Sequence, residues 1–437
     1  MTLLKFAGIL ILVVLLAWTQ ALDIFGVDNT IEQQLLGFAG NTVGRAPDDD
    51  IRLIYINETG NGSLGNFREA TERQAWRAHH AKLIHLLADA EAKLVAFDLV
   101  FPHPIKKHQD ANDELVNAIQ SVRENKTTHV LIGHDNKSDM DKDIIAAVGD
   151  LRSFGKLGVA RELQQPGVSG RTVAEVVIAE ASISALAGGV TRQKSVLPQP
   201  MPWALLSAAQ DTIPSEQGAP EIRGGELYAK KTGIKISIVE RECRATTLNC
   251  PAEEEATAHR WAMLPIWMGG SASFIERSYA SVVQQETLST DYKGKIVIVG
   301  ARVPEDKLNI DGSSTVWGYQ AYARILADVK HGTYLRRPAT YLQVLILALA
   351  ITVGAFARRF FRGLEVKVPV PFLGSLALPL ALFVCFIGVG LLAVAHLAQA
   401  AVLHQISYHW LALITGYYVL GRASKKDEKS ITEGSGS

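Results

Sequence analysis

The chain has 437 residues, with 44 Lys plus Arg and 44 Asp plus Glu, so its formal net charge is zero. That balance argues against a nucleic-acid-binding protein, which usually carries a strong basic excess. Hydrophobic residues make up 48% of the chain and charged residues 20%, and this composition excludes an intrinsically disordered protein. The length suggests about three domains, and the apolar residues are concentrated near the two ends, unlike those of an ordinary soluble protein.

Four apolar segments without formal charge are candidates to cross a lipid bilayer. A spanning helix needs about 20 mostly apolar residues, and the four segments are residues 6–22, 339–357, 368–394 and 400–420. The first segment is borderline in length, and a cleaved signal peptide is its alternative interpretation because Thr19-Gln20-Ala21 is a tolerable cleavage site. We favour an uncleaved anchor. The expected organisation is an N-terminal anchor, an extracytoplasmic domain, three membrane helices and a tail, over residues 1–25, 26–338, 339–421 and 422–437.

Basic residues beside the spans predict their orientation. One cluster lies in the link between the second and third spans and consists of Arg358, Arg359, Arg362 and Lys367. The other lies in the tail after the fourth span and consists of Arg422, Lys425, Lys426 and Lys429. The positive-inside rule places both clusters in the cytoplasm. We therefore expect a multi-pass protein of the bacterial inner membrane, with residues 26–338 in the periplasm and the C-terminus in the cytoplasm. Arg336 and Arg337 oppose this orientation but are outnumbered.

The residue pattern of the extracytoplasmic segment predicts strands and helices in alternation. Short β-branched apolar runs are typical of buried strands, and leucines at helical spacing are typical of amphipathic helices. The expected strands are residues 51–56, 93–99, 129–132 and 295–300, and the expected helices are 77–90, 110–120, 202–209 and 319–331. A strand–helix–strand order implies parallel pairing through a right-handed crossover. We therefore expect an α/β domain with a mainly parallel sheet that is covered on both faces.

A series of short motifs occurs in this segment in a fixed order. They are Ser63-Leu64-Gly65, the stretch from Ala92 to Phe101 with Asp98 inside it, Gly189-Val190-Thr191-Arg192, the stretch from Asp291 to Ala301, and Gly332-Thr333-Tyr334-Leu335. With one span before them and three after them, they resemble the type 2 CHASE domain, a cyclase/histidine-kinase-associated sensory extracellular domain. The resemblance implies a sensory domain. Members of that family generally carry a cytoplasmic cyclase, kinase or phosphatase domain, and we expect this chain to lack one.

Four acidic residues are candidates for binding a ligand. Asp98 falls near the carboxyl end of a predicted strand, Glu58 falls at the end of what we expect to be its neighbour, and Asp306 and Asp311 lie in the loop after residues 295–300. Ligand crevices in open α/β sheets form at the carboxyl ends of strands. Carboxylates there can hold a cation, a sugar hydroxyl or an amine. The alternative is that they cap helices or anchor loops through backbone amides.

Other kinds of site have little support in the sequence. Cys243 and Cys250 both fall in the extracytoplasmic segment, where they can form a disulfide or remain free thiols. No further soft ligands are spaced for a zinc site, and the glycines at 60, 62 and 65 lack the Lys-Ser/Thr of a P-loop. We therefore expect no metal, no cofactor and no enzymatic activity.

The expected function is that of a membrane-anchored sensor. An unknown ligand or partner protein would bind the extracytoplasmic domain and shift the membrane helices between two conformations. The expected partners are the lipid bilayer and a separate effector, with no nucleic acid, and a homo-oligomer is compatible with the sequence. One alternative is a non-catalytic scaffold or assembly subunit of an envelope complex, and another is an extracytoplasmic hydrolase.

Overall fold

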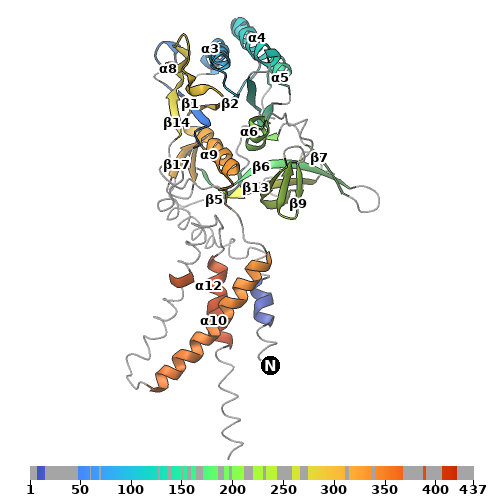
Figure 1. Cartoon of the computed structure of the whole chain (residues 1–437), viewed down its shortest axis with the longest axis vertical. Helices are drawn as coiled ribbons and strands as arrows, with labels where there is room; N and C mark the ends of the chain where they lie inside the picture. The colour runs from blue at the N-terminus through green and yellow to red at the C-terminus, as the bar shows by residue number, and fades with distance from the viewer. Residues whose placement is uncertain are drawn as a thin grey trace, which may run out of the picture. The chain divides into compact units, whose positions relative to one another are not determined.

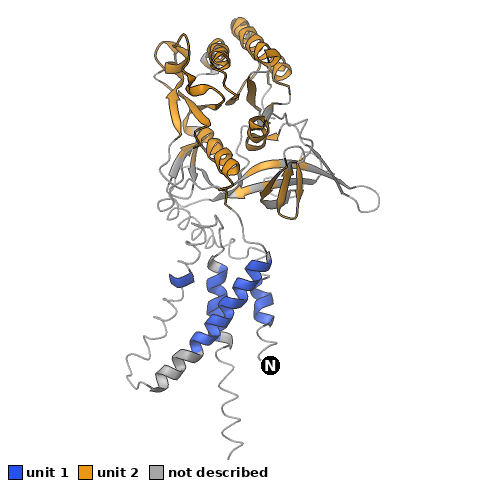
Figure 2. Ribbon diagram, viewed as in Figure 1, with its two compact units in different colours: residues 1–39, 336–437 blue, residues 40–335 orange. Residues whose placement is uncertain are grey.

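The computed structural model divides the chain into two compact units, residues 1–39 with 336–437 and residues 40–335 (Figure 2). The residues that it describes are 7–14, 48–59, 61–67, 70–125, 128–134, 140–149, 151–154, 159–163, 171–185, 191–195, 199–210, 220–229, 233–243, 258–265, 274–310, 314–335, 340–367, 387–389 and 406–420.

A parallel sheet of seven strands forms the centre of the larger unit. Its strand order is β14-β1-β15-β2-β3-β4-β8, and every neighbouring pair is parallel. The strands are β1 (Ile51–Asn57), β2 (Leu94–Val100), β3 (His129–His134), β4 (Arg152–Phe154), β8 (Gln199–Pro200), β14 (Ile275–Ser278) and β15 (Ile296–Arg302). The first six residues of β15 are all buried, as expected for a parallel strand that is covered on both faces.

Helices cover both faces of this sheet (Figure 1). One face carries a group of helices that pack on one another: α3 (Ala70–Asp89), α4 (Gln109–Asn125), α5 (Lys142–Val148) and α8 (Tyr279–Val283). The opposite face carries α6 (Met201–Ala209) and α9 (Gly318–His331), which pack on each other. α9 also packs on β1 and β15. Short 3₁₀ turns complete this half of the unit: η2 (Gly62–Leu64), η3 (Lys106–His108), η4 (Thr290–Tyr292) and η5 (Pro304–Asp306).

A second, mainly antiparallel sheet packs beside α6. Its strand order is β12-β13-β6-β16-β17, with β5 and β7 also paired to β6, and only the β6–β16 pair is parallel. These strands are β5 (Val159–Leu163), β6 (Arg171–Ala185), β7 (Thr191–Ser195), β12 (Val239–Cys243), β13 (Ala258–Pro265), β16 (Lys307–Ile310) and β17 (Ser314–Trp317). A three-stranded antiparallel sheet is formed by β9 (Glu221–Arg223), β10 (Glu226–Ala229) and β11 (Ile234–Ser237).

The smaller unit consists of helices. Residues 7–14 and 387–389 are helical, and the longer elements are α10 (Thr340–Lys367), α12 (Ile406–Thr415) and the π-helical turn η6 (Gly416–Leu420). α10 and α12 approach closely at two glycines. A Cβ atom on Gly354 would lie 2.1 Å from the carbonyl oxygen of Leu413, and one on Gly416 would lie 2.1 Å from that of Ile351. No other residue fits at these two positions without moving a backbone.

The predicted α/β domain with a mainly parallel sheet is confirmed. All four expected strands and all four expected helices of this domain are present, although α3 begins at Ala70, seven residues before the expected start at 77. The second sheet was not predicted, because residues 171–179 alternate only weakly in polarity.

Four membrane helices are not confirmed. Among the described residues, one helix is long and apolar enough to cross a membrane, over Tyr341–Arg358 of α10. The expected span at 368–394 lies outside the described residues except for 387–389. α10 also continues to Lys367, so residues 358–367 are helical where we expected a link between two spans.

Candidate functional site

The strand order places the point where strand connections go to opposite faces at the carboxyl end of β15. β1 and β2 are each followed by a helix on one face of the sheet, α3 and α4, whereas the chain after β15 leads to α9 on the other face (Figure 1). β15 lies between β1 and β2. Ligands of open α/β sheets bind where neighbouring strands send their connections to opposite faces. The candidate site is therefore the carboxyl edge of β1, β15 and β2.

Three residues lie side by side on these strands, on the face of the sheet that α9 covers. Tyr55 of β1 pairs with Gly300 of β15, and Gly300 pairs with Asp98 of β2. Residues paired in this way project from the same face of the sheet. Gly300 leaves room for Tyr319 of α9, since a Cβ atom on Gly300 would lie 2.5 Å from the Cβ atom of Tyr319. The glycine thus brings the first turn of α9 onto the sheet between Tyr55 and Asp98.

Asp98 is half-buried beside the amino-terminal end of α9. A Cβ atom on Gly318, the first residue of α9, would lie 3.2 Å from Oδ2 of Asp98. Burial raises the pKa of Asp98 well above its usual value, and the negative charge of Asp306 raises it further. The described residues donate no hydrogen bond to this carboxylate. Asp98 is therefore a carboxyl group that is held in an environment that disfavours its charge.

Arg302 organises the neighbouring polar groups. Its Nε donates to the hydroxyl of Tyr319 at 3.0 Å, and its guanidinium carbon lies 3.6 Å from the centre of the Tyr55 ring. The guanidinium also forms an ion pair with Glu276 of β14. Glu276 in turn accepts a hydrogen bond of 2.5 Å from Nε2 of Gln320. Burial raises the pKa of Tyr319, which therefore remains a neutral hydroxyl. This network fixes the first turn of α9 to the ends of β1, β14 and β15.

The predicted site residues are brought together only in part. Asp98 and Asp306 are close enough for their charges to interact. Glu58 follows β1, but β1 is not the neighbour of β2 as we expected, because β15 lies between them. Asp311 lies outside the described residues.

Several other predictions about sites also depend on residues that are not described. Cys243 ends β12, while Cys250 lies outside the described residues, so the disulfide stays a prediction. Among the described residues, no group of three His, Cys, Asp or Glu side chains can hold a metal ion. A surface hollow of about 350 Å³ between α4 and α5 is lined by none of the candidate residues.

Sequence reasoning missed Arg302, Glu276 and the first turn of α9. These residues come from three separate segments, and nothing in their local pattern indicates that they meet. One signal was available, because Gly300 interrupts an otherwise apolar strand. A glycine inside a strand often marks the close approach of another part of the chain.

A second polar group at the carboxyl edge of the sheet is fully enclosed. Arg77 of α3 and Asp141, which precedes α5, form an ion pair at 3.7 Å with both side chains 1% exposed. Arg77 also donates to Asn112 and to the carbonyl of Pro102, and Asn112 donates to Asp141 at 3.1 Å. The other carboxylate oxygen of Asp141 accepts from the backbone amides of Asp143 and Ile144, both at 2.9 Å.

Aromatic side chains surround the next turn of α3. Nδ1 of His80 lies 2.7 Å from the hydroxyl of Tyr279. The His80 ring makes edge contacts with Phe97 and Phe101, and Tyr279 also contacts Trp76. Burial lowers the pKa of His80 to about 3, and the positive charges of His79 and Arg77 act in the same direction. His80 is therefore neutral at physiological pH, and this region is part of the core.

Comparison with known families identifies the domain. The sequence profile of the CHASE2 domain matches residues 7–356. This match covers most of the chain, so the protein belongs to the CHASE2 domain family, a family of extracellular sensory domains. No curated protein and no solved structure matches the sequence.

Proposed function

We propose that this protein is a membrane-anchored sensor whose ligand binds at the carboxyl edge of β1, β15 and β2. The observation that carries the proposal is Asp98, a carboxyl group with a raised pKa at the point where the strand connections diverge. Strongly perturbed titratable groups in such positions are candidates for function. The negative charge of nearby Asp306 raises the pKa of Asp98 further and does not offset the effect of burial.

The charge of this edge indicates the chemistry of the ligand. A cation, an amine or another hydrogen-bond donor would lower the cost of ionising Asp98, whereas an anion would increase it. The proposal assigns no catalytic step to the chain. Binding would favour one of two conformations, and the output would pass to a separate effector.

The proposed arrangement in the membrane has four spans, with residues 26–338 in the periplasm and the C-terminus in the cytoplasm. The difference between the buried and the exposed side of α10 supports contact of the exposed side with lipid. One side is buried against residues 7–14 and α12 through Leu347, Ala350 and Ile351. The other side exposes large apolar groups at helical spacing: Tyr341, Leu345, Leu349, Val353 and Phe356. The basic residues at 358–367 support a cytoplasmic position for the end of α10.

Thermal unfolding of the full chain in nanodiscs tests the ligand site. The probes are divalent cations, polyamines, amino acids and neutral sugars, each measured separately. We expect at least one cationic or amine probe to raise the Tm of the wild type and to lose most of that effect in Asp98→Asn. Asp89→Asn is the matched control, because Asp89 is an exposed aspartate at the end of α3.

Two results would contradict the proposed site. One is a probe that stabilises Asp98→Asn as much as the wild type. The other is the absence of any effect across all the probes, together with a protein that co-purifies in a stoichiometric complex, which would favour the scaffold function instead.

Protease accessibility tests the orientation separately. Protease added to intact spheroplasts is expected to cut between Val27 and Arg337 and to leave residues 358–367 intact. The reverse pattern would contradict the proposed orientation while leaving the ligand measurement unaffected.

A further inference from the structure

Helix α9 connects the two opposite edges of the parallel sheet. Its first turn lies at the carboxyl edge, where Gly318 approaches Asp98 and Tyr319 accepts a hydrogen bond from Arg302. Its 14 residues give a length of roughly 21 Å at 1.5 Å per residue. Its last turn therefore reaches the amino edge, beside the residues that precede β1 and β15.

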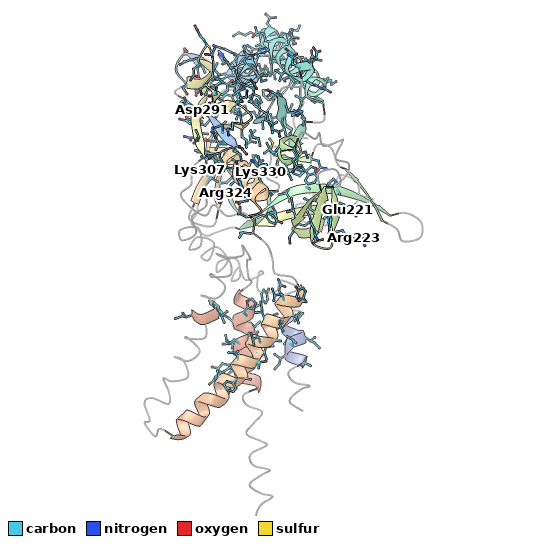
Figure 3. The ribbon with its side chains drawn as sticks, in the orientation of Figure 1. Glu221, Arg223, Asp291, Lys307, Arg324 and Lys330 are labelled. Atoms are coloured by element: carbon cyan, nitrogen blue, oxygen red, sulfur yellow. The ribbon has the colours of Figure 1, made fainter. Side chains whose placement is uncertain are left out.

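The middle of α9 is enclosed on all sides. Every residue from Ala321 to Asp328 is buried, including the charged side chains of Arg324 and Asp328. Figure 3 labels Arg324 and Lys330 on this helix. A helix buried in this way is packed by neighbours at near-crystalline density and transmits displacement rather than absorbing it. A shift at one end of α9 is therefore expected to reach the other end.

An ion cluster holds the last turn of α9 to the start of β1. Lys330 Nζ lies 2.7 Å from Oδ2 of Asp48 and 3.0 Å from Oδ2 of Asp50. Lys295, which precedes β15, lies 3.3 Å from Asp50, and Nε2 of His331 lies 3.3 Å from Asp48. We call Asp48, Asp50, Lys295, Lys330 and His331 the α9 joint.

Burial and backbone hydrogen bonds fix the two aspartates at the centre of the α9 joint. Asp48 is only 4% exposed, and its Oδ1 accepts a hydrogen bond of 2.8 Å from the amide of Asp50. The backbone carbonyl of Asp50 accepts a bond of 2.8 Å from the amide of Ile296. Hydrogen bonding to Lys330 is the main cause that lowers the pKa of Asp50, although burial opposes it. The Asp50 carboxylate therefore stays ionised and paired at neutral pH.

The α9 joint lies where the chain enters and leaves the domain. The residues before Asp48 connect the domain to the N-terminal apolar segment, and Leu335 is soon followed by α10, which begins at Thr340. In the sequence, the α9 joint thus includes the first described residue of this unit, Asp48, and His331, which is four positions before its last residue, Leu335.

We propose that α9 is the transmission element of this domain, and that the α9 joint makes the two connections respond together to a displacement at the first turn of α9. The proposal rests on the proposed function, because it assigns the input to the carboxyl edge of β1, β15 and β2. It adds the route by which the input reaches the rest of the chain.

Hydrogen exchange of the full chain in nanodiscs tests this route without any ligand. Gly300→Ala places a Cβ atom against Tyr319 and so displaces the first turn of α9. We expect faster amide exchange at 326–335 and at 48–53, about fivefold, which corresponds to about 1 kcal/mol. When Lys330→Met is added, Gly300→Ala should no longer affect residues 48–53. Its effect at 326–335 should persist.

Two further variants keep the result interpretable. Tyr319→Phe removes the hydrogen bond from Arg302 at 3.0 Å and serves as a gentler displacement if Gly300→Ala does not fold. Lys293→Met is the matched control, because it breaks an exposed pair with Glu91 at 2.8 Å near the same edge of the sheet. This control is expected to leave the coupled response intact.

The proposal is overturned if the faster exchange stays within residues 296–302 and 318–324. It is also overturned if Lys330→Met and Lys293→Met have the same effect on residues 48–53. Because no ligand is added, a failed ligand screen would not produce either outcome, and the two proposals can fail independently.

Discussion

Two groups of ionisable side chains lie at the carboxyl edge of the same parallel sheet, and they differ in how their charges are satisfied. Around Arg77, the guanidinium and the Asp141 carboxylate are paired and hydrogen-bonded although both are 1% exposed. Around Asp98, a half-buried carboxyl group faces the like charge of Asp306 and accepts no hydrogen bond from the described residues.

The difference separates a structural role from a functional one. Buried polar groups in native proteins are almost always hydrogen-bonded, and an exception requires an explanation. The Arg77 group follows the rule and contributes to a unique packing of α3, α4 and α5. Asp98 is only half-buried, its pKa is raised, and it lies at the position where ligand crevices form, so we assign the ligand to Asp98 and not to Arg77.

Removal of Arg77 should have the largest effect on stability. Arg77→Met leaves Asp141 as a buried charge without its guanidinium partner, and we expect it to lower the free energy of unfolding by about 3–5 kcal/mol. Equilibrium unfolding in urea measures this loss. Lys82→Met is the control, since Lys82 is an exposed cation on the same helix, and its effect should stay within about 0.5 kcal/mol. Similar values for the two variants would contradict the structural role of Arg77.

Protonation of His80 should have the next largest effect. Its pKa is about 3 in the folded protein and 6.5 in the unfolded chain. Between these values the unfolded state binds more protons, so stability is lost as the pH falls below 6.5. The loss should be about 2 kcal/mol by pH 5, measured as the free energy of unfolding against pH.

A double substitution isolates the contribution of His80. His80→Phe with Tyr279→Phe removes both partners of the 2.7 Å contact, which avoids leaving one buried polar group unpaired. The pH dependence of this variant should be flatter than that of the wild type by the same amount. An unchanged slope would show that His80 does not titrate in this way.

The sequence predicts the local elements of this domain better than their arrangement. The apolar runs at 51–56 and 295–300 are strands as expected, because local burial and β-propensity decide them. Their order in the sheet depends on pairing between segments that are more than 200 residues apart. For that reason the insertion of β15 between β1 and β2 was not foreseen, and Glu58 was wrongly placed beside Asp98.

At the candidate site, too, residues that one short segment identifies could be predicted, and contacts between distant segments could not. Asp98 could be predicted because a carboxylate at the end of a strand is visible in one short segment. The partners of Arg302 could not, because Glu276 and Tyr319 reach it from β14 and α9, and Gln320 of α9 in turn bonds to Glu276. Only Gly300 carried a local indication that another element packs against the strand.

Substitution of Asp98 should have the smallest effect on stability, and it should stabilise the protein rather than destabilise it. The folded-state pKa of Asp98 lies above its unfolded value, chiefly because of burial. The stability that this group contributes is therefore present at low pH and is lost as the pH rises through the folded-state pKa. Asp98→Asn removes that loss, and we expect the variant to be more stable than the wild type at neutral pH by on the order of 1 kcal/mol.

The dependence of this gain on pH distinguishes it from a general packing effect. A single proton limits the slope of the difference between variant and wild type to about 1.4 kcal/mol per pH unit, and the difference should vanish well below pH 3.8. Asp89→Asn should show no comparable gain, because Asp89 is exposed. If Asp98→Asn were instead destabilising at neutral pH, the carboxylate would have to be satisfied in the folded state. The contrast with Arg77, and with it the assignment of the ligand to this edge, would then fail.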